Sequence, residues 1–174
     1  MQKIPYGISD YKRLKTENYY FIDKTPFIQK LEDAGSFLMF LRPRRFGKSL
    51  LISMLHYYYD IYYKDRFDEL FSDTYVGKHP TDEVNKFYIL KFDFSGISID
   101  DVNERFRFYV NITFANFIKK YNLDIQLGEN IKDNFYKIFG FFKNTNKSLY
   151  ILIDEYDHFA NRLLIQESNN YEEL

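Results

Sequence analysis

Cysteine and tryptophan are absent from the sequence, and proline and glycine are scarce, with 4 and 7 among 174 residues. A chain without cysteine can form neither a disulfide nor a thiolate zinc site. The three histidines, His56, His79 and His158, are too scattered along the sequence to indicate a metal cluster. These absences favour the reducing cytoplasm as the location of the protein.

Long apolar runs and a strong charge of either sign are also missing. No uninterrupted apolar stretch approaches the roughly 18 residues that a membrane helix needs, and the start Met1-Gln-Lys-Ile-Pro5 is not typical of a signal peptide. The formal net charge of −1 gives no overall attraction to nucleic acid or anionic lipid. We expect no membrane partner, and any contact with nucleic acid would depend on a local patch.

Aromatic residues are abundant, with 19 Phe and 17 Tyr, beside 28% charged residues. This composition excludes a disordered chain. At 174 residues, the length fits one globular domain with a sizeable core. We interpret the aromatic residues as core rather than as platforms for stacking nucleic-acid bases.

The most informative motif is Arg42-Pro-Arg-Arg-Phe-Gly-Lys48-Ser49, which lies between the apolar run 37–41 and a helical pattern. A strand, a turn and a helix in this order form the context of a phosphate-binding loop. The backbone N–H groups of the turn and of the helix N-terminus would face a phosphate chain, and Lys48 would reach the terminal phosphates. Ser49 would then bind Mg²⁺. Arg42 replaces the first glycine of the pattern G-x-x-x-x-G-K-[ST].

A second motif lies downstream, where the apolar run Leu149–Ile153 leads into Asp154 and Glu155. Such a run predicts a fully buried parallel strand with acids at its carboxyl end, where α/β sheets bind ligands. Asp154 would hold the water shell of Mg²⁺, and Glu155 would orient and deprotonate an attacking water molecule. The catalytic residues would thus be Glu155 and Lys48. The alternative is an ordinary buried strand capped by solvated acids.

Hydrophobic periodicity predicts alternating helices and strands around these motifs. We expect a short helix with Thr25 at its N-cap and Pro26 in its first turn, and a second strand over residues 88–94. A capping box at Ser98 and Asp101 would begin a further helix. The expected buried faces of the three longer helices are Leu51, Met54, Leu55, Tyr58 and Tyr59; Phe106, Tyr109, Val110, Thr113 and Phe117; and Ile131, Phe135, Ile138, Phe139 and Phe142.

Four strings of the sequence together resemble the AAA-ATPase-like family: Ile4-Pro-x-Gly-Ile8, Tyr20-Phe-Ile-Asp-Lys-Thr25, Phe40-Leu-Arg-Pro-Arg-Arg-Phe-Gly-Lys-Ser49 and Leu152-Ile-Asp-Glu-Tyr-Asp157. In the longer members of this family, a P-loop ATPase domain is followed by a nuclease-like domain of the PD-(D/E)-x-K type. The resemblance covers nearly the whole chain, and the family also carries arginine in place of the first loop glycine. It implies ATP binding and hydrolysis, with Walker A and Walker B roles for Lys48, Ser49, Asp154 and Glu155.

The resemblance also implies the fold and the extent of the chain. The expected fold is a three-layer α/β/α P-loop NTPase with a mainly parallel sheet, incomplete because the strands after the Walker B strand are lacking. We expect an N-terminal segment at residues 1–36 near the nucleotide site, a partial ATPase core at residues 37–165, and a polar end at residues 166–174. Expected partners besides ATP are the missing C-terminal part of a longer protein, a second copy of the chain, and nucleic acid through a nuclease-like domain.

By the same resemblance, the segment around Asp23 and Lys24 lies beside the nucleotide base or ribose, whereas from the residues alone Asp23 caps the following helix. Arg44 and Arg45 would either contact phosphate or form structural ion pairs. The residues expected to bind the cofactors ATP and Mg²⁺ are Asp23, Arg44, Arg45, Phe46, Gly47, Lys48, Ser49 and Leu50, with Ser49 and Asp154 at the metal.

Two other functions stay open at this point. One is a nucleotide-binding or interaction module without turnover, because a helical lid and a partner's arginine are lacking. The other is a phosphotransferase, since kinases share the phosphate loop. Glu155 beside Asp154 argues against the phosphotransferase, because a water-activating glutamate suits hydrolysis better than transfer to a hydroxyl.

Overall fold

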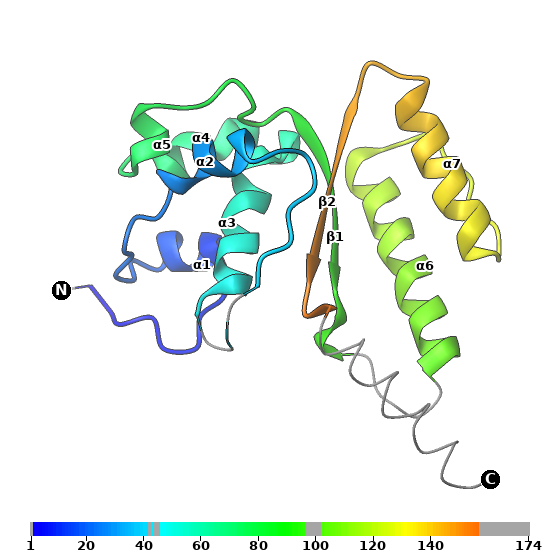
Figure 1. Ribbon diagram of the computed structural model, residues 1–174, viewed down its shortest axis with the longest axis horizontal. Coiled ribbons are helices and arrows are strands. Elements are labelled where there is room, and N and C mark those ends of the chain that lie inside the picture. The colour runs from blue at the N-terminus through cyan, green and yellow to red at the C-terminus, as the bar shows by residue number, and fades with distance from the viewer. Residues whose placement is uncertain (1, 42, 44–45, 97–101, 157–174) are drawn as a thin grey trace, which may run out of the picture. The chain divides into compact units, whose positions relative to one another are not determined.

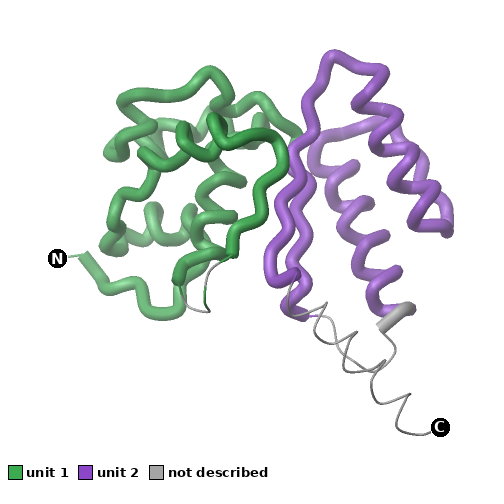
Figure 2. Tube along the Cα trace, viewed as in Figure 1, with its two compact units in different colours: residues 1–88 green, residues 89–174 purple. Residues whose placement is uncertain are grey.

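A computed structural model of the protein describes residues 2–41, 43, 46–96 and 102–156. The chain divides into two compact units, residues 1–88 and residues 89–174 (Figure 2). The described part of the first unit is mainly helical, and that of the second contains a small parallel sheet with helices beside it (Figure 1). The expected mixed α/β class is therefore confirmed. No described helix has both the length and the apolar character to cross a membrane.

The first unit is built around α3. Its elements are α1 (Tyr11–Thr16), α2 (Phe27–Asp33), α3 (Lys48–Tyr59), the 3₁₀-helix η1 (Ile61–Arg66), α4 (Phe67–Phe71) and α5 (Tyr75–Lys78) (Figure 1). Tyr11 links three of them, because its N–H donates to Ser53 Oγ at 2.9 Å and its hydroxyl donates to the Leu70 carbonyl oxygen at 2.9 Å. The Tyr11 ring also stacks on Phe71 with ring centroids 4.9 Å apart. These contacts fix α1 and α4 against α3.

The helix predicted after the phosphate loop is confirmed as α3. Of its expected apolar face, Met54, Leu55, Tyr58 and Tyr59 are buried, and Leu51 is half-buried. The i, i+3, i+4 spacing found this face because every fourth or so side chain of a helix points the same way. Asp60 ends the helix and is fully buried, with its carboxylate accepting the Tyr62 N–H at 2.9 Å.

The strand predicted over residues 37–41 is wrong. These residues form no regular element, and all five side chains are exposed, Phe37 almost completely at 99%. A strand exists only where a second strand accepts its backbone hydrogen bonds, and no described strand or bridge pairs with this run. The run is apolar, but an apolar composition does not by itself provide a partner strand.

The second unit is a sheet with two helices. It comprises most of β1 (Phe87–Asp93), the 3₁₀-helix η2 (Phe94–Gly96), α6 (Val102–Tyr121), α7 (Ile131–Lys143) and β2 (Ser148–Asp154). The strands β1 and β2 lie side by side and parallel, and α6 and α7 lie beside them (Figure 1). The Phe92 ring packs against Phe114 of α6, which meets Phe135 of α7 edge to face at a centroid distance of 4.7 Å. The two strands predicted for this unit, over residues 88–94 and 149–153, are confirmed with ends that differ by one residue.

Two packing predictions for this unit need correction. The strand β2 is not fully buried, because the exposed Ile151 and Ile153 alternate with the buried Leu152 and Asp154. Alternation with a period of two is typical of a strand covered on one face only. On α7, Ile138 and Phe142 are buried as expected, but Phe139 is exposed. The predicted capping box at residues 98–101 lies outside the described residues.

Two tyrosine hydroxyls of α6 bind the backbone of β1. The Tyr121 hydroxyl accepts the Ile89 N–H at 2.9 Å, and the Tyr109 hydroxyl accepts the Asp93 N–H at 2.6 Å. Residues 89 and 93 are separated by an even number of positions, so their N–H groups point to the same edge of the strand. Side chains therefore occupy that edge of β1, and β2 pairs with the opposite edge.

Candidate nucleotide site

The predicted phosphate loop ends in a left-handed glycine. Gly47 is the N-cap of α3 with φ of 77°, a conformation that residues with a Cβ adopt only with strain. Apart from the two chain neighbours of Gly47, no atom of the described residues lies within 4 Å of the position that a Cβ would occupy there, which leaves space for a ligand beside the backbone. Lys48 and Ser49 follow as the first residues of the helix, and both are half-buried. The first turn of a helix points its N–H groups outward, which favours an anion such as phosphate.

A cavity of about 320 Å³ adjoins this helix start. Gly47, Leu50 and Leu51 line it from the loop and α3, and Tyr20, Ile22 and Lys24 line it from the N-terminal segment. Volumes of this size hold small ligands, and the walls are mainly apolar. The cavity thus places a mainly apolar space beside the position expected for phosphate.

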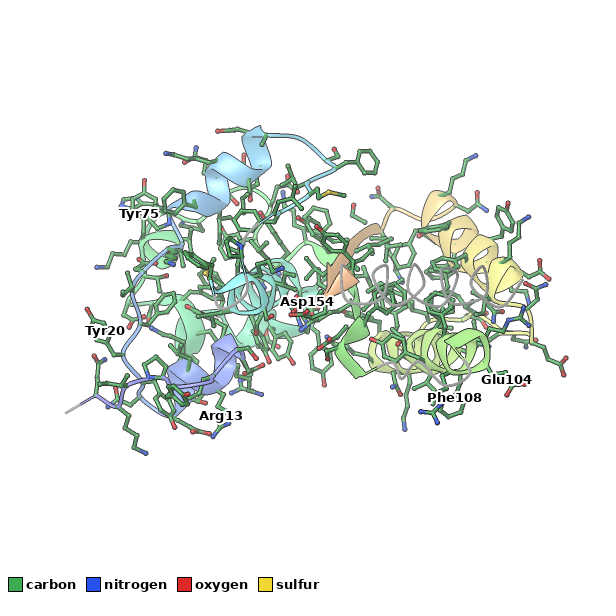
Figure 3. The ribbon with its side chains drawn as sticks, turned by 60° about the horizontal axis from the view of Figure 1, so that its bottom comes forward. Arg13, Tyr20, Tyr75, Glu104, Phe108 and Asp154 are labelled. Carbon is green, nitrogen blue, oxygen red and sulfur yellow. The ribbon has the colours of Figure 1, made fainter. Side chains whose placement is uncertain are left out.

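Hydrogen bonds hold the N-terminal segment in place on both sides of Lys24. The Asp23 carboxylate accepts the Thr25 N–H at 2.8 Å with one oxygen and the Tyr75 N–H at 2.7 Å with the other. The Thr25 hydroxyl is fully buried and accepts the Val76 N–H at 3.3 Å. Figure 3 labels Tyr75, the first residue of α5.

The expected role of Thr25 as helix cap is wrong. The helix α2 begins after Pro26, no side chain caps its N-terminus, and the Thr25 hydroxyl bonds to α5 instead. Short-range patterns locate caps within the same helix, whereas this bond joins residues 51 positions apart. No local signal in the sequence could have found it.

The acid pair lies at the carboxyl end of β2, where Figure 3 labels Asp154. Asp154 is 4% exposed, and its carboxylate accepts the N–H of Glu155 at 3.0 Å. Glu155 has φ of 55°, a left-handed conformation that is uncommon for a residue with a side chain. Strained conformations of this kind occur most often at functional sites, and they persist only where the surrounding structure holds them in place.

The side chains of Ser49 and Asp154 carry oxygen atoms, which are ligands of the type that Mg²⁺ prefers. Among the described residues, no group of three or more His, Asp or Glu side chains could hold a metal ion. Mg²⁺ is commonly held by one or two protein oxygens together with phosphate oxygens and water. The residues expected at the metal, Ser49 and Asp154, belong to different units, the first to residues 1–88 and the second to residues 89–174.

The structure brings together the described members of the predicted phosphate site, Phe46 to Leu50, at the start of α3. Arg42, Arg44 and Arg45 lie outside the described residues, as do Asp157 and His158. The sequence did not single out Tyr20 as a site residue, although it lines the cavity. The aromatic run 19–21 offered no signal that distinguishes a cavity wall from core.

The chain is similar to known proteins, to a family over most of its length and to a single protein over a short segment. The family model described as Predicted AAA-ATPase matches residues 5–174. A protein of Azotobacter chroococcum mcd 1, named "Uncharacterized protein in vnfD 5'region", is 40% identical to this chain over 55 residues. That match covers 31% of this chain and 11% of the relative, so the aligned part is a small share of the relative's length. No solved structure matches the chain.

Proposed function

The chain belongs to the predicted AAA-ATPase family, and from this premise we propose that it binds Mg²⁺-ATP at the start of α3 and hydrolyses it. The single observation that carries the proposal is the junction at Gly47. There a left-handed glycine opens the N-terminus of α3 directly beside an apolar cavity of about 320 Å³. A nucleotide needs both parts, a donor-rich end for phosphate and an apolar space for the base.

In this proposal the phosphates lie against the first turn of α3. Backbone N–H groups of the loop and helix donate to phosphate oxygens, and the Lys48 ammonium balances the charge of the terminal phosphates. The base enters the cavity between Tyr20 and Leu51. Phe46, Leu50 and the arginines Arg44 and Arg45 complete the binding residues that we propose.

Hydrolysis would depend on the acid pair. Glu155 takes a proton from a water molecule as the water oxygen bonds to the γ-phosphorus, while the bond from that phosphorus to the β–γ bridging oxygen breaks. The products are ADP and inorganic phosphate. Ser49 and Asp154 would hold Mg²⁺, which when bound offsets charge on the phosphate oxygens. The left-handed backbone of Glu155 supports this role because strained conformations of this kind are found most often at functional sites.

We propose a three-layer P-loop domain as the fold on the basis of the family and of the mixed α/β composition of the described elements. A second copy of the chain, nucleic acid and a longer C-terminal part remain proposed partners. They rest on the family alone, since the aligned region covers 11% of the relative.

The test of nucleotide binding is calorimetry with Mg²⁺-ATP on the wild type and on Lys48→Ala. We expect the variant to bind at least about tenfold more weakly, a loss of about 1.4 kcal/mol. Lys64→Ala, on the exposed face of η1, is the matched control and should bind as the wild type does. Equal affinity for wild type and a well-folded Lys48→Ala would exclude the loop as the nucleotide site.

Phosphate release separates the remaining functions. Release of phosphate from ATP with no acceptor present would indicate hydrolysis, whereas formation of ADP only with an added hydroxyl acceptor, with the phosphoryl group on that acceptor, would indicate a phosphotransferase. Tight binding without any release would indicate a nucleotide-binding module without turnover.

A further inference from the structure

Helix α6 carries an apolar line on its exposed side. Phe108 is 68% exposed and Ile112 is 42% exposed, and Ala115 is exposed as well. Their spacing of i, i+4 and i+7 places the three side chains next to one another along the helix. Arg105 and Lys119, both exposed, lie on the same side before and after them. We call these five residues the α6 stripe, and Figure 3 labels Phe108 among them.

The opposite side of α6 packs within the second unit. Phe114 contacts Phe92 of β1, and the hydroxyls of Tyr109 and Tyr121 bind the backbone of β1. These contacts involve no member of the α6 stripe, so they do not explain why the stripe is apolar. A second apolar line at i, i+4 and i+7 is typical of a helix that also packs against a helix of a partner.

The charge of α6 is mainly positive. The helix contains four basic residues, Arg105, Arg107, Lys119 and Lys120, and one acid, Glu104. The whole chain, in contrast, has a formal net charge of −1. A basic residue therefore lies at each end of the apolar line, and a partner that covers the line is complementary if it places Asp or Glu beside both ends.

The spacing of the charges favours a helix over a nucleic acid as the partner. Arg105 and Lys119 are about 21 Å apart along the helix axis, at about 1.5 Å per residue. A nucleic acid binds through cations that follow its closely spaced phosphates and through rings on which its bases stack. Between the two basic ends, Ile112 and Ala115 offer neither a cation nor a ring.

The same charges disfavour a second copy of α6 as the partner. In an antiparallel pair, Arg105 of one copy would lie opposite Lys119 of the other. In a parallel pair, each basic residue would lie opposite itself. Like charges across an interface weaken binding, so neither arrangement is complementary.

We propose that the α6 stripe binds an acidic amphipathic helix of a partner protein. The partner helix presents apolar residues at i, i+4 and i+7, with an acid beyond each end of this line. Phe108 is the anchor, because large aromatic side chains at the centre of an interface carry much of the binding energy. The inference uses none of the residues of the proposed nucleotide site, so it does not depend on the proposed function.

The probe is a fluorescently labelled synthetic peptide of about 18 residues, which is long enough to cover the stripe. It repeats the spacing of the stripe in a background of alanine and glutamine, with leucine at the three apolar positions and glutamate at the two basic ones. Fluorescence anisotropy with the full chain measures its affinity. We expect Phe108→Ala to weaken binding at least about fivefold. Tyr136→Ala removes a ring that is 66% exposed on α7, and this matched control should bind the peptide as the wild type does.

A charge exchange tests the basic ends of the stripe. The double variant Arg105→Glu and Lys119→Glu should bind the acidic peptide more weakly than the wild type does. It should bind a second peptide, with lysine at the two end positions, more tightly than the wild type does. Both ends are exchanged together, so the result does not depend on the direction of the bound helix. If the double variant and the wild type prefer the same peptide, the charges do not select the partner and the proposal is overturned.

Other outcomes would also overturn the proposal. The stripe is not a docking surface if the acidic peptide does not bind, or if Phe108→Ala and Tyr136→Ala bind it equally well. The partner is a nucleic acid if an oligodeoxythymidine binds the wild type and not Phe108→Ala. The partner is a second copy if sedimentation shows a dimer that Phe108→Ala dissociates. Thermal melts of each variant establish that it is folded, and we expect no change because the substituted side chains are exposed.

Discussion

Glu155 illustrates how a single residue combines strain with chemistry. Its φ of 55° is a conformation in which glycine is relaxed and glutamate is not. The preceding Asp154 is almost fully buried and fixes the Glu155 N–H through its carboxylate. A glutamate at this position therefore costs stability, and this cost fits the role in the reaction that we propose for its carboxylate.

Two substitutions at Glu155 separate these effects. Glu155→Gln retains shape and hydrogen bonding but removes the base, so ATP affinity should persist while phosphate release falls by about 10²-fold. Glu155→Gly relieves the backbone strain, so the free energy of unfolding should rise by about 1 kcal/mol although hydrolysis is lost. Phosphate-release assays and urea unfolding measure the two quantities. Unchanged release in Glu155→Gln would remove this residue from the reaction.

Buried tyrosines make the stability of the first unit sensitive to high pH. Burial, together with the charges of Asp73 and Asp23, raises the pKa of Tyr11 well above its ordinary value. Burial and the hydrogen-bonded Asp10 likewise raise the pKa of Tyr57. In both cases the folded state holds the proton more tightly than the unfolded state, so their stabilisation is complete below the unfolded pKa of about 10 and is lost as pH rises beyond it.

We expect the free energy of unfolding to fall as pH increases from 10 to 11, because the unfolded tyrosines lose their protons over this range while the folded ones retain them. Tyr11→Phe lacks the ionising group, so its unfolding free energy should fall less steeply over this range. At pH 8 the variant should be the less stable protein, since the hydrogen bond to Leu70 is absent. Urea melts at several pH values give both comparisons, and equal slopes would exclude Tyr11 as a source of the pH dependence.

At the scale of the elements, the connection between α6 and α7 depends on one buried amide. Asn134 is fully buried, and its side-chain amide donates to Asn111 at 3.0 Å and to the Gly128 carbonyl oxygen at 2.9 Å. The Gly128 N–H donates back to the Asn134 side-chain oxygen at 2.8 Å. This network satisfies the backbone of a loop that has no regular structure of its own.

Asn134→Ala should therefore reduce the free energy of unfolding by about 2–3 kcal/mol, because it removes three hydrogen bonds and leaves their partners without them. Asn116→Ala, on an exposed position of α6, makes the same chemical change and should have little effect. Chemical denaturation of the two variants makes the comparison. A similar small change in both would mean that the network contributes nothing beyond helix propensity.

The elements also show what the sequence could and could not predict. Periodicity located α3, α6, α7 and both strands because burial on one face repeats at a fixed spacing within each element. It failed for the run 37–41, whose state depends on a partner strand elsewhere, and for Phe139, whose burial depends on neighbouring elements. The loop motif found Lys48 and Ser49, yet the bonds from Asp23 and Thr25 to α5 join distant residues and leave no local pattern.

At the scale of the whole molecule, the apolar run 37–41 stands out in the described part of the chain because all five of its consecutive side chains are exposed. Phe37, Met39 and Leu41 are largely exposed within five residues that carry no charge and no proline. Segments of this composition associate through backbone pairing when they are left uncovered. The described molecule therefore has a surface that favours contact between copies at high concentration.

Met39→Lys should weaken this association without loss of stability, because the Met39 side chain is 73% exposed. Gln29→Lys adds the same charge at an exposed position of α2 and serves as the control. Light scattering over a range of concentrations measures the association, and thermal melts measure stability. Equal association in both variants would show that net charge, and not the run, is responsible.

The hydroxyl groups of Tyr109 and Tyr121 limit the edge of the sheet at which a further strand can be added. They accept backbone N–H groups along one edge of β1, and β2 pairs with the other edge. A strand added later, from this chain or from another, can extend the hydrogen-bonded ladder only beyond β2. Whatever joins there lies next to the strand that ends in Asp154, so a neighbouring strand can deliver a new side chain to the acid pair from one direction alone.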